Sequence, residues 1–225
     1  MNTPSDTAEI ERIAAFRGEF KANEQPGWYN GYAHLAGTTS ISVIAILVAI
    51  AALDTVTAFE WFTVPLTFLY ANLIEYFGHR GPMHHKIRGL GLIHTRHSRQ
   101  HHRYFTDEHM SYDSSADFQA VLFPLILIVF YLGLFALPTA ALLALIFSKN
   151  VALLFIAVAV AYFLNYELLH FAYHAGPDSW IARLPLLGRL RRLHQTHHRP
   201  ELMTRYNFNI TYPIGDFFFG TLYRH

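Results

Sequence analysis

The sequence contains no cysteine among its 225 residues. Disulfides, iron–sulfur clusters and zinc ribbons all depend on cysteine sulfur, so each of these is excluded. Charge is also scarce, because Asp, Glu, Lys and Arg make up 15% of the chain, against about 25% in a soluble domain. Hydrophobic residues reach 52%. The shortage of charge therefore predicts an integral membrane protein rather than a soluble domain with a large core.

The N-terminal segment, residues 1–34, is polar and is predicted to be cytoplasmic, ahead of a membrane-embedded domain at 35–225. No apolar run as long as that of a secretory signal peptide occurs in the first 30 residues. Apolar residues recur near helical spacing at Ile10, Ile13, Phe16 and Phe20. This pattern predicts a helix that either lies on the membrane surface or packs on the protein body.

Uncharged stretches predict four membrane-spanning helices. A span needs roughly 20 mostly apolar residues, and the predicted spans cover residues 37–53, 60–79, 117–137 and 150–173. Pro138 leaves residues 139–147 either as an extension of the third span or as an interfacial turn. Short links at 54–59 and 148–150 join the spans into two hairpins, so the predicted fold is all-α.

Basic residues are distributed unequally over this topology. With four spans the long polar segments share one side, and of the 17 Lys and Arg residues all except Lys149 fall there. Cytoplasmic loops of membrane proteins carry such an excess. Both termini and a helical cap built from the long segments are therefore predicted to be cytoplasmic. Nucleic acid is not expected as a partner, because the basic residues all lie next to the membrane.

Histidine is abundant, with 15 residues, and ten of them fall into four clusters in or beside the predicted cap. The clusters are His79 with His84, His97 with His101 and His102, His170 with His174, and His194 with His197 and His198. Residues three or four apart share a helix face, so the last three clusters can each aim imidazoles at one point. Pro82 is predicted to end the first helix, which lets His84 fold back toward His79.

Ten converging imidazoles predict a cap that carries two metal ions. Neutral imidazole binds iron, zinc and copper, and ten nitrogens exceed what one ion can use. About five histidines would hold each ion, with one position left open. A solvated basic patch and a bis-histidine haem site are the alternatives. His85 and His94 lie beside the clusters but break their spacing, and their roles stay open.

The four clusters, in this order, resemble the histidine pattern of the fatty acid hydroxylase / sterol desaturase superfamily of integral-membrane diiron oxygenases. The resemblance rests on "EYFGHRGPMH", "HSRQHH", "ELLHFAYH", "LHQTHH" and the tail "NFNITYPIGDFFFGTL". It runs from about residue 61 to residue 222 and implies that the ten clustered histidines are metal ligands. Asn209 stands where the family more often has glycine, so an unusual backbone angle is expected there.

The resemblance implies an O₂-dependent hydroxylase with two iron ions that acts on a lipid such as a fatty acyl chain or a sterol. Zinc could occupy the same sites in purified protein. A lipid desaturase and a non-enzymatic membrane metal-binding protein remain as alternatives. No flavin, haem or cysteine-based redox motif is visible, so a separate donor such as ferredoxin or cytochrome b5 with its reductase is expected. Five arginines are expected to face anionic headgroups or that donor: Arg183, Arg189, Arg191, Arg192 and Arg199.

Three carboxylates are candidates to support the metal ligands. Glu75 lies four residues before His79, Glu167 lies three before His170, and Asp216 matches the acidic residue of the family's tail. Metal-bound histidines usually donate their second N–H to a carboxylate or a carbonyl. We therefore expect the three carboxylates to fix histidines or the backbone near them, and salt bridges with cap arginines are the alternative.

Overall fold

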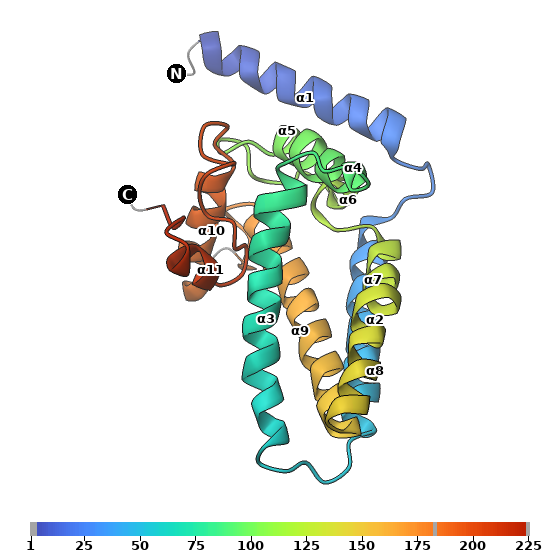
Figure 1. The fold of residues 1–225 in the computed structure, drawn as a ribbon. Coiled ribbons are helices and arrows are strands. Elements are labelled where there is room, and N and C mark those ends of the chain that lie inside the picture. Colours follow the sequence, from blue (N-terminus) through green and yellow to red (C-terminus); the bar gives the residue numbers. More distant parts are fainter. Residues whose placement is uncertain (1–3, 182–183, 224–225) are drawn as a thin grey trace.

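The computed structural model describes residues 4–181 and 184–223, and every regular element in that part of the chain is helical. Arg183, expected in the basic surface, lies outside the described residues. Five helices stand side by side in an upright bundle (Figure 1). Its members are α2 (Gly31–Ala51), α3 (Thr63–Gly78), α7 (Leu125–Tyr131), α8 (Leu137–Ile146) and α9 (Lys149–Tyr173).

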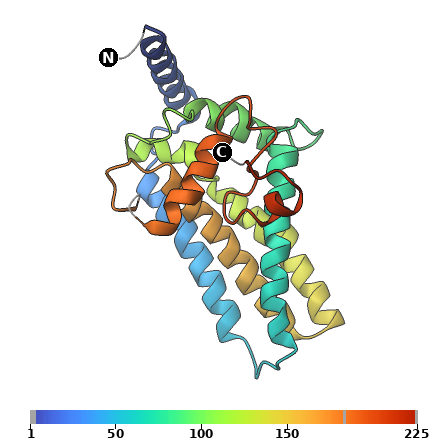
Figure 2. The ribbon, with the colours of Figure 1, turned by 90° about the vertical axis from the view of Figure 1, so that its left-hand side faces the viewer.

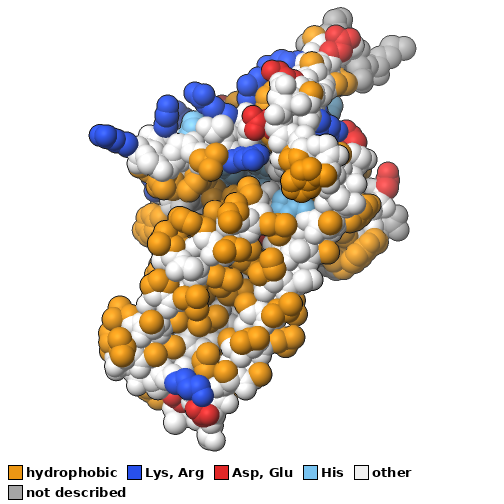
Figure 3. Space-filling view, turned by 90° about the vertical axis from the view of Figure 1, so that its right-hand side faces the viewer, with side chains coloured by type: hydrophobic (Ala, Val, Ile, Leu, Met, Phe, Trp, Pro, Cys, Tyr) orange, Lys and Arg blue, Asp and Glu red, His pale blue; other side chains and the backbone are white. Residues whose placement is uncertain are grey.

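Helix α9 is the centre of the bundle and packs against α2, α3 and α8 (Figures 1 and 2). Of its most apolar 18-residue window, 56% is buried inside the protein, against 22% for α2. Most of α2 therefore presents apolar side chains to the outside. Hydrophobic side chains cover the bundle in Figure 3, and charged side chains gather toward its ends. Such a surface suits a bilayer, where apolar side chains face lipid.

Three helical stretches are long and apolar enough to cross a membrane, namely Gly31–Ala51, Ser115–Ile146 and Lys149–Tyr173. Helix α3, predicted as a further span, has 16 residues and is not among them. The 3₁₀ turn η1 (Glu60–Phe62) and the π-helical turn η2 (His79–Met83) extend it at its two ends. The structure thus supports a helical membrane protein with three candidate spans, and the predicted fourth remains an expectation.

The stretch that contains Pro138 is continuous through that proline. Helix α6 (Phe118–Val121) ends at an extended Leu122, and α7 begins after Pro124. The π-helical turn η5 (Leu132–Ala136) then leads directly into α8, which has Pro138 in its first turn and runs to Ile146. Proline is tolerated there because it lacks only an N–H and its fixed φ suits a first turn. Residues 139–146 therefore extend the helix.

Two links close the lower end of the bundle in Figure 1. Glu60, buried beside the first link, accepts hydrogen bonds from the Ser148 hydroxyl at 2.5 Å and from the Thr57 N–H at 2.8 Å. Asn150 accepts one from the Asp54 N–H at 3.0 Å. These bonds hold the two links against each other, at the end of the bundle away from the histidines.

The upper end carries short elements that form the cap: α4 (Gly91–His94), the π-helical turn η3 (Thr95–His101), α5 (His102–Tyr104), the 3₁₀ turn η4 (Ser115–Asp117), α6, α10 (Pro185–His197) and α11 (Ile214–Phe218). Helix α1 (Pro4–Glu24) crosses above them (Figure 1). Ile13 and Phe20 on α1 are buried, and the Phe20 ring meets Tyr104 edge-on at 5.4 Å. Helix α1 therefore packs on the protein body, as one of the two alternatives predicted.

Candidate metal centre

All ten clustered histidines are buried, and none exposes more than 7% of its surface. They converge from four parts of the chain, namely the end of α3 with η2, the η3–α5 segment, the end of α9, and α10. A solvated basic patch is therefore wrong, because its side chains would face water. What remains is a buried concentration of neutral or metal-bound imidazoles.

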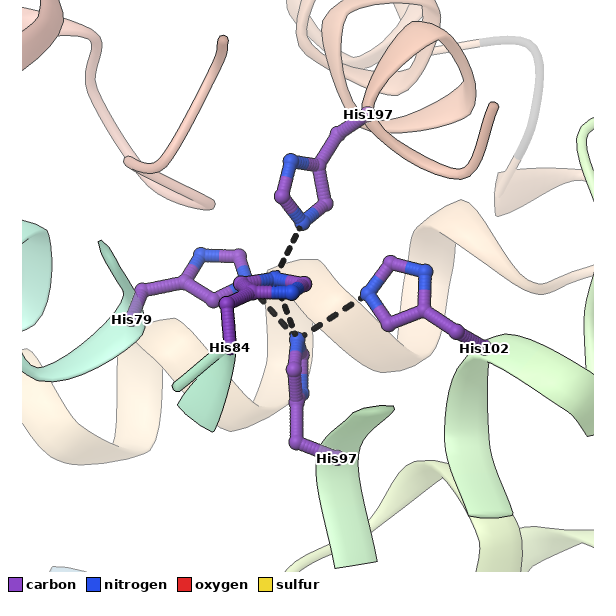
Figure 4. Close-up of side chains that lie close together, drawn as sticks. All are labelled: His79, His84, His97, His102 and His197. Atoms are coloured by element: carbon purple, nitrogen blue, oxygen red, sulfur yellow. Dashed lines mark hydrogen bonds between the residues drawn. The ribbon is translucent and has the colours of Figure 1, made fainter. Parts of the chain in front are cut away.

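Five of the histidines form a set that we call group A (Figure 4). Its members are His79, His84, His97, His102 and His197, and their ligand atoms all lie within 4.8 Å of one another. The Nε2 atoms of His79 and His97 are 2.7 Å apart, and those of His84 and His197 are 2.9 Å apart. The rings point inward from three segments of the chain toward one point.

A second set, group B, contains His101, His170, His174 and His194, whose ligand atoms also lie within 4.8 Å of one another. His198 adjoins this group, because its Nε2 lies 3.2 Å from that of His101 and 3.1 Å from that of His194. We include His198 in group B. Groups A and B then contain five histidines each.

The division does not follow the four sequence clusters. His97 and His102 join group A while His101 joins group B. A π-helix closes its hydrogen bonds between residues five apart, so residues at that spacing approach one face. The π-helical turn η3 accordingly brings the Nε2 atoms of His97 and His102 to 3.1 Å. The expectation that each cluster aims at a single point was wrong for the two clusters that contain three histidines.

The same geometry corrects the role predicted for Pro82. The helix does not end before this residue, because η2 runs through to Met83 with Pro82 inside it. His79 and His84 are five apart, and their Nε2 atoms lie 3.1 Å from each other. His84 does approach His79, through a widened turn rather than through the end of a helix.

Backbone carbonyls fix the orientation of half the histidines. Five Nδ1 atoms lie 2.5–2.9 Å from a carbonyl oxygen. The pairs are His79 with Phe208, His101 with Ala120, His174 with Met110, His197 with Tyr206, and His198 with Phe105. A carbonyl only accepts, so each of these Nδ1 atoms carries the proton. In the neutral ring Nε2 is then left with a free lone pair.

In His101 and His198 this orientation directs two unprotonated nitrogens at each other. Both rings donate from Nδ1 to a carbonyl, and their Nε2 atoms face each other at 3.2 Å. Two unprotonated nitrogens at that distance cannot hydrogen-bond, and a cation between them would relieve their repulsion. Burial also lowers the pKa of His101 and of His197 to about 4. The rings of His101 and His197 therefore stay neutral near pH 7, in the form that binds metals.

Asp216 supports the site through the backbone. It is fully buried and accepts hydrogen bonds from the N–H groups of Phe208, at 2.9 Å, and Asn209, at 2.7 Å. Phe208 in turn offers its carbonyl to His79. The Asp216 carboxylate thus fixes the tail segment whose Phe208 carbonyl orients His79 of group A. Fixing the backbone near a histidine was one of the roles expected for Asp216.

Glu75 and Glu167 also accept hydrogen bonds from backbone N–H groups. Glu75 accepts from the N–H groups of Ile210 and Thr211, and Glu167 accepts from the Phe123 N–H at 3.1 Å. Among the hydrogen bonds of the described residues, none joins either glutamate or Asp216 to one of the ten histidines. The expected support is therefore indirect and passes through the segments that carry the carbonyls.

The tail places its unusual backbone angle at Asn207, with φ of 56°, rather than at Asn209 as expected. Asn207 holds this conformation through hydrogen bonds that include one from its side chain to the Leu193 carbonyl, at 3.0 Å. The Asn209 side chain instead joins the tail to α3, donating to the Asn72 carbonyl at 3.0 Å and accepting from the Asp216 N–H at 3.2 Å.

The histidines with open roles lie outside both groups. His85 is exposed, and its Nδ1 lies 2.8 Å from the Arg80 carbonyl. His94 is half-buried and belongs to neither set of converging ligand atoms. His34 is a buried residue of α2 whose Nε2 lies 2.9 Å from the Phe123 carbonyl.

A small recess reaches both groups. It has a volume of about 30 Å³, and His97, His101 and His170 line it together with Val121, Leu122 and Phe123. A cavity needs roughly 10–15 Å³ of such volume to hold one water molecule. The recess suits a molecule of the size of water or dioxygen, whereas a lipid chain needs its walls to move apart.

Comparisons with known proteins relate the chain to fatty acid hydroxylases. The model of the fatty acid hydroxylase family matches residues 64–221, which include all ten histidines. A structure of full-length Scs7p, in which only the hydroxylase domain is visible, superposes with a TM-score of 0.60 at 19% identity, covering 87% of this chain and 67% of that one. At this identity the likeness concerns the fold alone. No curated protein matches the sequence.

Proposed function

The chain belongs to the fatty acid hydroxylase family, and from this premise we propose that it hydroxylates a lipid at a site that holds two iron ions. The facing Nε2 atoms of His101 and His198 carry the proposal, because their arrangement suits a cation and not a hydrogen bond. Groups A and B would each hold one ion. When bound, the ions supply the activation of dioxygen and the attack on a C–H bond, and the protein supplies position and exclusion of water.

The number of ligands favours iron as the working metal. Structural zinc sites are closed by four ligands, whereas five imidazoles around an octahedral ion leave one position open for oxygen. Imidazole binds zinc as well as iron, so affinity alone does not select between them. Zinc is therefore expected in part of any preparation from cells that supply more zinc than iron.

The chain's own residues orient the ligands and keep water out. The carbonyls of Phe208 and Phe105 hold His79 and His198 with Nε2 directed inward. Burial of all ten rings removes bulk water from the reacting position, and the recess beside His101 leaves room for a small molecule. A lipid would reach the site from the bilayer once the segment around Leu122 moves aside.

Hydroxylation needs an external source of electrons. Conversion of a C–H bond and O₂ into an alcohol and water consumes two electrons and two protons besides those of the substrate. We propose a separate reductive partner, either a ferredoxin or cytochrome b5 with its reductase. The exposed Arg189 on α10 belongs to the surface that such an acidic partner would meet.

We further propose that α3, extended by η1 and η2, is a fourth span and that the cap is cytoplasmic. Among the described residues, Lys149 is the one basic residue at the end of the bundle that carries the two links, and the other described Lys and Arg residues fall in the segments that lead to the cap. An excess of basic residues marks the cytoplasmic side. The reductive partner would then approach from the cytoplasm.

Lipid mass spectrometry of expressing cells tests the proposal. The matched variants are His84→Ala, which removes a buried member of group A, and His85→Ala, which changes its exposed neighbour. Cells with the wild type or with His85→Ala should contain a lipid that has gained one oxygen. Cells with His84→Ala should lack it.

Two other outcomes would replace the proposal. A lipid that has lost two hydrogens, again dependent on His84, would identify a desaturase that uses the same histidines. If no lipid changes although the purified wild type holds two metal ions, a non-enzymatic membrane metal-binding protein would be the better description.

A further inference from the structure

Helix α1 inserts one arginine into the cap. Arg17 exposes only 9% of its surface. Its guanidinium donates to the carbonyl of Tyr104 at 3.0 Å, to that of His109 at 3.2 Å and to that of Ser111 at 3.1 Å. It also pairs with Asp113 at 2.8 Å. One side chain thus contacts the last residue of α5 and three residues of the loop that follows it.

The three carbonyl contacts of Arg17 hold the loop more firmly than its ion pair with Asp113 does. The Asp113 side chain is 74% exposed, and an ion pair open to solvent contributes little to stability. The three carbonyls instead receive N–H groups from a largely buried guanidinium, whose donors lie in a fixed planar fork. Its carbon lies 5.0 Å from the centre of the Tyr104 ring and 5.2 Å from that of Phe105. The loop is therefore wrapped around Arg17.

This loop orients two ligands of group B. The carbonyl of Phe105 accepts from His198 Nδ1 at 2.7 Å, and the carbonyl of Met110 accepts from His174 Nδ1 at 2.7 Å. The Phe105 ring also packs on His174, with ring centres 4.3 Å apart. Both acceptors lie within the stretch of chain that Arg17 holds, between Tyr104 and Asp113.

Group A depends on a different segment. The acceptors of His79 and His197 are the carbonyls of Phe208 and Tyr206 in the tail, which Asp216 holds. Arg17 has no hydrogen bond to that tail among the described residues. A change at Arg17 should therefore reach one group and spare the other.

We infer that Arg17 is a positioning residue for group B, because it fixes the loop whose carbonyls set the direction of His174 and His198. The inference rests on the proposed two-metal site. It gives a role to α1, which lies outside residues 64–221 that the family model matches. It predicts that α1 alters metal binding, although none of its residues belongs to either histidine group.

Metal analysis of the purified full-length chain tests this role. Arg17→Ala should hold about one metal ion per folded chain where the wild type holds two. Arg12→Ala is the matched control, since Arg12 lies on the same helix with its side chain 76% exposed, and it should keep two ions. A second, milder variant is Arg17→Lys, which retains the charge near Asp113 but cannot reach three carbonyls, and it should fall between these values.

Combined variants show which ion is lost. Adding His101→Ala to Arg17→Ala should cause little further loss, because both changes act on group B. Adding His102→Ala, which acts on group A, should remove the remaining ion. Hydrogen–deuterium exchange should become faster at residues 104–113 in Arg17→Ala and Arg17→Lys, and stay unchanged in Arg12→Ala.

The results separate this inference from the proposed function. Two ions per folded chain in both Arg17 variants, even with a lower melting temperature, would reduce Arg17 to a structural contact and overturn the inference. Fewer than two ions in the wild type would instead refute the two-metal proposal. In that case hydrogen–deuterium exchange at residues 104–113 still tests the role of Arg17. Unchanged exchange in the Arg17 variants would show that Arg17 does not position the loop.

Discussion

His101 and His102 are consecutive in the chain, and their imidazoles belong to different histidine groups. The two ring planes are nearly perpendicular, at 88°. His101 Nε2 lies 3.1 Å from that of His170, while His102 Nε2 lies 3.1 Å from that of His97. Adjacent side chains point about 100° apart on a helix, so one peptide bond separates members of the two histidine groups.

This division predicts that substitutions of the neighbouring residues His101 and His102 disturb different histidine groups. His101→Ala and His102→Ala should each lower the metal content from two ions per chain to about one, because each leaves one group with a missing ligand. The double variant should hold almost none. His101→Ala combined with His198→Ala should stay near one, since both belong to group B. Elemental analysis of folded, size-selected protein measures this, and equal losses in the two double variants would refute two separate groups.

Asp216→Ala should loosen group A. Its carboxylate accepts from two buried N–H groups of the tail, and a hydrogen bond to a charged group contributes roughly 1.5–3 kcal/mol. Without it the Phe208 carbonyl loses its position against His79. We expect a lower melting temperature and loss of one metal ion. The control is Asp178→Ala at an exposed carboxylate, and two retained ions in Asp216→Ala would contradict the prediction.

Acid should destabilise the metal-free protein. An unfolded histidine binds a proton below about pH 6.5, whereas folded His101 and His197 have a pKa of about 4. Between these values unfolding takes up protons. The free energy of unfolding should thus fall as the pH falls, by about 1.4 kcal/mol per pH unit for each such histidine. Melting of chelator-treated protein in detergent at pH 7.5, 6 and 5 measures this, and a constant melting temperature would contradict it.

Cysteine labelling tests the orientation directly, because the native sequence has no cysteine. Ala58→Cys lies in an exposed link, and Glu108→Cys lies in an exposed part of the cap. In intact cells an impermeant thiol reagent should label the first and not the second. After the membrane is opened, both should react. Labelling of Glu108→Cys alone in intact cells would place the cap outside and would exclude the approach of a cytoplasmic reductant.

Sequence reasoning singled out the ten converging histidines but not how they divide between the two groups. The ten histidines could be named because imidazoles at short spacing are rare and visible, and the apolar stretches showed where helices would lie. The distribution between groups depends on two π-helical turns, η2 and η3. A single inserted residue widens a helical turn at little cost, and no residue type marks it. The split between His97 and His101 therefore appears only in three dimensions.

The acceptors of the histidines were also beyond sequence reasoning. Glu75, Glu167 and Asp216 drew attention as charged residues near the histidines, yet five of the ten Nδ1 atoms meet backbone carbonyls instead. Every residue has a carbonyl, so its use by His198 or His174 leaves no trace in the sequence. Arg17 lies 181 positions before His198, and its link to the histidines passes through a loop whose contacts with them no residue type in the sequence marks.

The interleaving of the two groups sets an order for biosynthesis. A growing chain presents His79, His84, His97 and His102 early, but group A is complete only when His197 has been made. Group B, which includes His198, likewise waits for His194 and His198. Because domains form from the N-terminus onward during synthesis, the helices must enter the membrane and pack before either site can close. Metal delivery is therefore a late event, and a ribosome that stalls before α10 leaves a chain with no finished site.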